Sequence, residues 1–73
     1  MTDTQLLRTE NEWSKIAGET ILVEHIGGAV YGFGSELGCL RLLNRFRYSK
    51  PEEIKVDYSE NQESWFFRLE TRG

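Results

Sequence analysis

The chain has 73 residues, which predicts one small domain spanning residues 1–73. Its hydrophobic content of 38% and charged content of 29% are typical of a globular domain and exclude a disordered tail. The formal net charge of −3 argues against a dedicated nucleic-acid-binding protein. With one cysteine and one histidine, the chain cannot form an internal disulfide or supply four ligands to a structural zinc ion.

The sequence also carries no sign of a membrane span or a secretory leader. No apolar run approaches the roughly 18 residues that a spanning helix needs, and the stretch MTDTQLLRTE lacks a basic block followed by an apolar one. The unpaired Cys39 fits a reducing compartment. We therefore expect a cytoplasmic protein, of bacterial or phage type on grounds of size, and we find no internal repeat.

The N-terminal segment is predicted in two parts. Residues 1–8 carry no pattern, and we expect them to be disordered. Thr9 and Glu12 have the spacing of a capping box, which predicts a short helix beginning there. A short strand at residues 13–17, followed by a turn, fits the same residues, and the sequence leaves both alternatives open.

A first hairpin is predicted at residues 20–26 and 29–33. The segment TILVEHI is rich in β-branched residues, and Gly27 and Gly28 form a two-residue loop in which both tolerate positive φ. Such a loop pairs Ile26 with Ala29, Glu24 with Tyr31 and Leu22 with Phe33.

A helix is predicted at residues 35–47. Ser35 is a suitable N-cap, and Glu36 places a negative charge in the first turn, where the helix dipole favours it. Apolar residues at 39, 40, 43 and 46 share one helical face. Pro51 makes it difficult for the helix to continue.

A second hairpin is predicted at residues 54–58 and 65–70, across the polar loop SENQES. The register that matches the apolar faces pairs Tyr58 with Trp65, Val56 with Phe67 and Ile54 with Leu69. The predicted fold class is thus α+β, a small antiparallel sheet of four to five strands with the helix 35–47 packed on one face. An αββαββ arrangement with a short first helix is the alternative.

The stretch YGFGSELG is a candidate for a catalytic or cofactor-binding role. Its glycines, at positions 32, 34 and 38, are spaced like a phosphate-binding turn, but Glu36 places a negative charge where the phosphate would lie. Ser35 lacks the motif of an activated nucleophile, His25 has no second ligand or base beside it, and Cys39 lies on an apolar helix face. We expect no enzyme activity, no catalytic residue, no cofactor and no metal.

The aromatic residues predict an interaction surface. Trp65, Phe66 and Phe67 are consecutive, so both faces of the last strand are apolar, whereas one helix covers only one face. The surface needs cover from the N-terminal segment or from a partner, and both remain open. We expect a non-catalytic module, without membrane contact, that binds a protein partner or itself through Tyr31, Phe33, Trp65 and Phe66.

The basic end of the predicted helix gives an alternative function. Arg41, Arg45, Arg47 and Lys50 lie within one short segment, and Phe46 and Tyr48 stand among them. Cations interleaved with aromatic residues are one pattern of nucleic-acid contact. Under this alternative the chain is a nucleic-acid-associated accessory protein that binds through these four cations.

Overall fold

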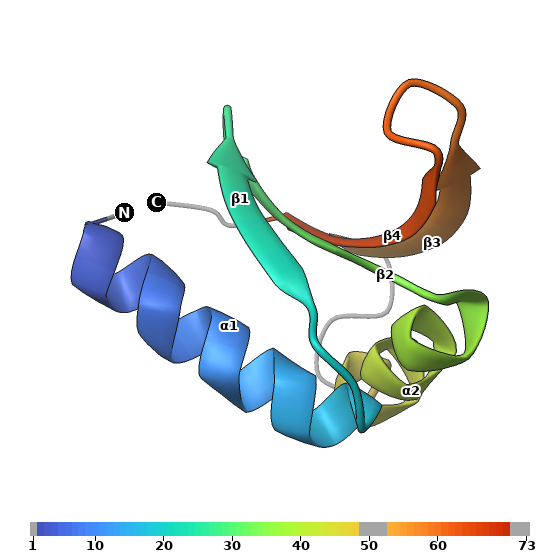
Figure 1. Cartoon of the computed structure of the whole chain (residues 1–73), viewed down its shortest axis with the longest axis horizontal. Coiled ribbons are helices and arrows are strands. Elements are labelled where there is room, and N and C mark those ends of the chain that lie inside the picture. The colour runs from blue at the N-terminus through green and yellow to red at the C-terminus, as the bar shows by residue number, and fades with distance from the viewer. Residues whose placement is uncertain (1, 49–52, 71–73) are drawn as a thin grey trace.

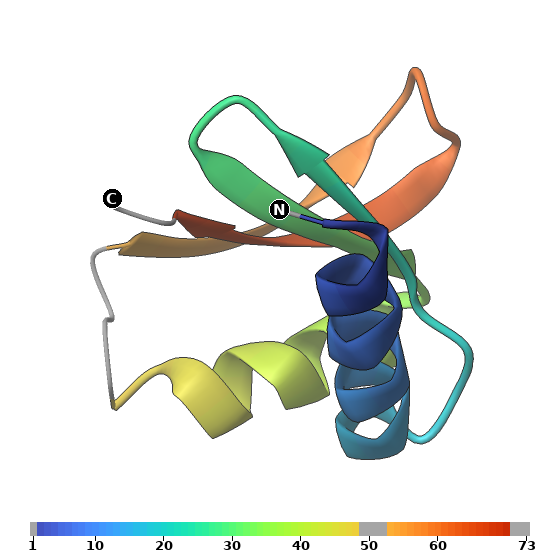
Figure 2. The ribbon, with the colours of Figure 1, turned by 90° about the vertical axis from the view of Figure 1, so that its left-hand side faces the viewer.

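The computed structural model describes residues 2–48 and 53–70. These residues form, in order, α1 (Asp3–Ala17), β1 (Leu22–Ile26), β2 (Ala29–Gly34), α2 (Glu36–Phe46), β3 (Ile54–Ser59) and β4 (Ser64–Glu70). The strands make one antiparallel sheet in the order β1-β2-β4-β3, and both helices lie on the same side of it (Figures 1 and 2). The predicted α+β class is confirmed, with the αββαββ order of the alternative.

The first helix begins earlier than the sequence analysis expects. The Thr2 hydroxyl accepts a hydrogen bond from the backbone N–H of Gln5 at 3.2 Å, and the Gln5 side chain accepts one from the Thr2 N–H at 2.9 Å. This capping box starts α1 at Asp3. In place of the disorder expected at residues 1–8, the structure has the first turns of a helix here, from Asp3 onward.

The rest of α1 decides between the two alternatives for residues 9–17 in favour of helix. Trp13 and Ala17 are buried and Ile16 is half-buried, so one helical face points inward. The helix ends at Gly18, whose φ of 75° is readily adopted by glycine alone. With 15 residues α1 is longer than α2, not the short helix of the αββαββ alternative.

Both hairpins form with the predicted registers. β1 and β2 pair Leu22 with Phe33, Glu24 with Tyr31 and Ile26 with Ala29. β3 and β4 pair Ile54 with Leu69, Val56 with Phe67 and Tyr58 with Trp65. In the loop of the first hairpin positive φ occurs at Gly27 (60°) but not at Gly28, which differs from our expectation and is the pattern of a type II′ turn.

The pairing of β2 with β4 joins the two hairpins into one sheet. Gly32 lies opposite Phe67, and the flanking pairs are Tyr31 with Arg68 and Phe33 with Phe66. A half-turn about an axis through the Gly32–Phe67 pair exchanges these two flanking pairs and carries β1 onto β3. The strand pairing therefore has an approximate two-fold symmetry.

The two halves related by this symmetry are both αββ units, residues 2–34 and 35–70. The N-cap Thr2 corresponds to the N-cap Ser35, and Leu22 in β1 corresponds to Lys55 in β3. Between residues 2–26 and 35–59 this offset aligns the same amino acid in five pairs of described positions: Leu7 and Leu40, Arg8 and Arg41, Asn11 and Asn44, Ile21 and Ile54, and Val23 and Val56. The repeat escapes the sequence analysis because the matches are sparse and only the strand pairing reveals their alignment.

The core fills the space between the helices and the sheet. Phe67, on the central strand β4, is fully buried, and the rings of Trp13 and Phe46 contact it at centroid distances of 5.1 and 5.8 Å. The other buried residues of this cluster are Ala17, Ile21, Val23, Val30, Cys39 and Leu42. Gly32 leaves the room that the Trp13 ring occupies, since a methyl group there would lie 2.7 Å from Trp13 Cε3.

Candidate functional site

The sheet face that the helices leave uncovered, which we call the open face, is the candidate functional site. Tyr31 and Phe33 project from β2 onto this face, and Phe66 joins them from β4. The rings of Tyr31 and Phe33 are stacked at 6.1 Å, and Phe66 lies 5.7 Å from Tyr31. All three side chains are half-buried. We call them the aromatic cluster; the structure thus brings together three of the four aromatic residues expected to bind a partner.

Trp65, the fourth of these residues, lies on the other face of the sheet. It packs against the core beneath the sheet, with the Tyr58 ring edge-on at 5.9 Å. The reason is the alternation of side chains along a strand, which sends Trp65 and Phe67 to one face and Phe66 to the other. Trp65 therefore does not contribute to the open face.

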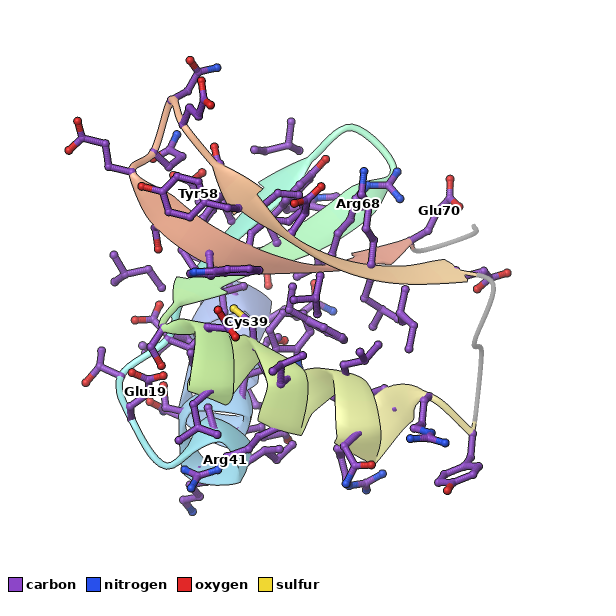
Figure 3. All side chains as sticks on the ribbon, turned by 90° about the vertical axis from the view of Figure 1, so that its right-hand side faces the viewer. Glu19, Cys39, Arg41, Tyr58, Arg68 and Glu70 are labelled. Carbon is purple, nitrogen blue, oxygen red and sulfur yellow. The ribbon has the colours of Figure 1, made fainter. Side chains whose placement is uncertain are left out.

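Arg68 belongs to the open face and was missed in the sequence analysis. Its Nε donates a hydrogen bond to the Tyr31 hydroxyl at 3.2 Å, and its guanidinium lies 5.9 Å from the centre of the Tyr31 ring. A Glu70 carboxylate oxygen is 3.7 Å from the other end of the guanidinium, and Figure 3 shows both side chains on the open side of the sheet. The pairing of Tyr31 with Arg68 would have predicted this contact, but it requires β2 to lie beside β4.

The open face continues onto β1 as an apolar surface with a groove. Leu22 is 60% exposed and Ile26 is 53% exposed, although both are large hydrophobic residues. The groove has a volume of about 420 Å³, and its walls include Leu22 and Glu24 from β1, Phe33 from β2 and Ser64 from β4. An acidic side chain thus stands beside the apolar walls.

In the glycine-rich stretch, a side chain of the protein itself fills the space at the N-terminus of α2. The carboxylate of Glu19 accepts hydrogen bonds from the Ser35 N–H, at 3.3 Å, and from the Ser35 hydroxyl. Ser35 Oγ in turn accepts the N–H of Gly38 at 3.1 Å and caps the helix. A methyl group at Gly38 would collide with Glu19. The glycine at 38 therefore makes room for an internal carboxylate at the helix N-terminus, the position that a bound phosphate would take.

Cys39 lies between α2 and the sheet and has no exposed surface (Figure 3). Burial raises the pKa of its thiol from 9.0 to about 11; a hydrogen bond with the Gly34 backbone opposes this shift and the charge of Glu19 adds to it. At neutral pH the group is a protonated, inaccessible thiol, which is unsuited to nucleophilic work.

This raised pKa predicts a stability change at alkaline pH. Below about pH 9 the Cys39 thiol is protonated in both the folded and the unfolded chain and contributes no pH dependence. Between about pH 9 and 11 the unfolded chain loses the proton first, so the free energy of unfolding falls, by about 1 kcal/mol at pH 10. Urea unfolding of the wild type and of Cys39→Ala across this range isolates the contribution. Parallel pH profiles of the two proteins would contradict it.

The cations of the alternative nucleic-acid site are engaged in different contacts. Arg41 donates a hydrogen bond from Nη1 to the Ala17 carbonyl oxygen at 2.8 Å and thereby holds the C-terminus of α1 against α2. The guanidinium of Arg45 lies 5.5 Å from the Phe46 ring, and that of Arg47 lies 4.9 Å from the Tyr48 ring. Lys50 lies outside the described residues.

Fold and surface together define a small four-stranded antiparallel α+β domain, with two helices on one face and a cluster of aromatic rings on the other. In residues 2–48 and 53–70 no helix is long and apolar enough to cross a membrane. Nor do these residues include a group of three His, Cys, Asp or Glu side chains placed to hold a metal ion. No family model matches the chain, and no curated protein or solved structure matches it either.

Proposed function

We propose that the chain is a non-catalytic interaction module that binds a protein partner, or a second copy of itself, through the open face of the sheet. The supporting observation is the aromatic cluster: three half-buried rings, on two adjacent central strands, that neither helix covers. Tyrosine and phenylalanine are enriched in the buried centres of protein interfaces. We place the module in the cytoplasm, on the ground that its single cysteine is unpaired.

The surroundings of the cluster favour a protein partner over other ligands. Leu22 and Ile26 extend the apolar surface at one side, and the charged residues at the other side come in both signs. Arg68 lies beside Glu70, and Lys55 lies 3.9 Å from Asp57. An apolar centre with a mixed polar rim is the usual composition of a protein interface.

Single-stranded nucleic acid is the second candidate, because bases stack on exposed aromatic rings. Its affinity depends mainly on cations that contact phosphates. On the open face Arg68 and Lys55 each have a carboxylate within 4.0 Å, and Arg41, at the basic end of α2, is bonded to Ala17. These contacts leave fewer free cations than the sequence suggests, and the protein partner is the stronger proposal.

Photo-cross-linking in the native cell tests this function. With a photoreactive phenylalanine analogue at Phe33, we expect one dominant protein adduct, or a cross-linked dimer of the chain itself. The same analogue at Leu37 is the matched control, because Leu37 is 58% exposed but lies on α2. Equal adducts at both positions, or none at position 33, would refute the proposal, and an RNA adduct at position 33 would favour the second candidate.

A further inference from the structure

The two edge strands of the sheet, β1 and β3, differ in how readily they can pair with a further strand. Within the part of the chain that the structure describes, β1 and β3 each have a sheet neighbour on one side only, so each presents outward-facing backbone N–H and C=O groups. On the open face β3 carries the ion pair of Lys55 and Asp57, and charged side chains of this kind discourage pairing with other chains. The symmetry-related positions on β1 are Leu22 and Glu24.

At the edge of β1 (Figure 2) the apolar Leu22 therefore takes the place of Lys55, whereas Glu24 keeps the negative charge of Asp57. Leu22 and Ile26 are exposed on either side of Glu24, and all three lie on the open face. Ile26 and its partner on β2 flank a two-residue hairpin loop and therefore form a hydrogen-bonded pair. Because hydrogen-bonded and non-hydrogen-bonded pairs alternate along an antiparallel ladder, the backbone N–H and C=O groups of Val23 and His25 point away from β2. The backbone of a further strand can therefore form hydrogen bonds with these groups.

The groove lies on the β2 side of β1, and a long side chain from such a strand can enter it by crossing β1 on the open face. Leu22 and Phe33 are apolar walls for a side-chain stem, and Glu24 supplies a negative charge. Lysine and arginine combine an apolar stem with a cationic end. The groove thus matches a basic side chain better than an acidic or a purely apolar one.

Glu24 also argues against a second copy as the occupant. Antiparallel pairing of β1 with the β1 of another copy, centred on this strand, places the two Glu24 side chains directly opposite each other. Like charges at opposite positions of neighbouring strands destabilise the pairing. A lysine or arginine at that position would instead form a favourable cross-strand pair.

We propose that β1 binds an extended segment of a partner protein as a fifth strand, with lysine or arginine opposite Glu24 and apolar residues two positions to either side. The apolar residues cover Leu22 and Ile26, and the backbone of the segment pairs with Val23 and His25. This inference rests on the proposed function, since it names the kind of partner that the interaction module binds.

Two synthetic peptides test the proposal by NMR titration of the whole chain. In the first, isoleucine, lysine and valine alternate with threonine; in the second, glutamate replaces lysine. We expect the lysine peptide to bind about tenfold more tightly, because it exchanges a repulsive cross-strand pair for an attractive one. Binding should slow amide exchange at Val23 and His25.

Charge-reversed variants sharpen the test. Glu24→Lys should invert the preference between the two peptides, whereas Asp57→Lys, at the corresponding position of the other edge strand, should leave it unchanged. Binding without charge preference, no binding up to the solubility limit of the peptides, or protection on β3 instead of β1 would overturn the proposal. So would wild-type protection at β1 that depends on protein concentration alone, which would identify a second copy as the occupant. If the Phe33 cross-link persists while the peptides fail, the interaction module stands and only strand addition is excluded.

Discussion

A chain in which Phe67 is replaced by alanine is expected to be largely unfolded at room temperature. Removing a buried phenylalanine ring costs about 3–5 kcal/mol, and one small core rarely provides more than about 3–5 kcal/mol in total. Phe67 has no exposed surface and contacts Trp13 from α1 and Phe46 from α2. Its ring therefore links both helices to the centre of the sheet.

Circular dichroism and amide NMR spectra of the variant, beside two controls, measure this effect. Phe67→Leu keeps much of the side-chain volume and should stay folded with reduced stability. Phe66→Ala removes the neighbouring ring, which is half-buried on the open face, and should also stay folded. A loss of structure in Phe66→Ala equal to that in Phe67→Ala would contradict the assignment of these residues to the two faces.

Replacing Gly32 by alanine is expected to destabilise the domain by about 1–3 kcal/mol, the usual cost of overpacking. This change in the free energy of unfolding is opposite in sign to the usual effect of replacing glycine by alanine in a strand, because alanine normally restricts the unfolded chain and so stabilises the folded protein. A methyl group at Gly32 would lie 2.7 Å from Trp13 Cε3 and 3.0 Å from Ile21 Cγ2. Both neighbours are buried side chains of the core, and neither can move without disturbing its own packing.

A double-mutant cycle with Trp13→Leu identifies the cause of this loss. The smaller leucine vacates the space that the new methyl group needs, so Gly32→Ala should cost less in this background than in the wild type. Urea unfolding of the four proteins gives the coupling free energy. Additive effects would show that the Trp13 ring does not restrict position 32.

On the open face, the residues of the two symmetry-related units differ in polarity. Leu22 and Phe33 of the first unit correspond to Lys55 and Arg68 of the second, while Tyr31 corresponds to Phe66. The aromatic cluster therefore lies near the symmetry axis, with an apolar region toward β1 and a charged region toward β3. This difference between the two related units directs the strand-addition proposal to β1, whereas the proposed interaction surface is centred on the aromatic cluster.

Some errors of the sequence analysis came from signals that are present in the sequence. Thr2 and Gln5 have the same capping-box spacing as Thr9 and Glu12, and only the first pair begins a helix. The two candidate N-caps compete to begin the same helix, and which of them does so depends on the packing of the helix as a whole. The assignment of Trp65 to the partner-binding surface contradicted the strand alternation that placed Phe66 there.

The sequence by itself determined the local structure: both hairpin registers, through alternating apolar residues and a diglycine loop, and α2, through the Ser35 cap. These features depend on residues close together in the chain. Tertiary structure alone decided that β2 pairs with β4, that Glu19 reaches Ser35 and that Arg41 binds the end of α1. Those contacts join distant segments, and they form because the apolar faces of two αββ units must cover each other. The open face arises from the same packing, since two helices on one side leave the other side of the sheet uncovered.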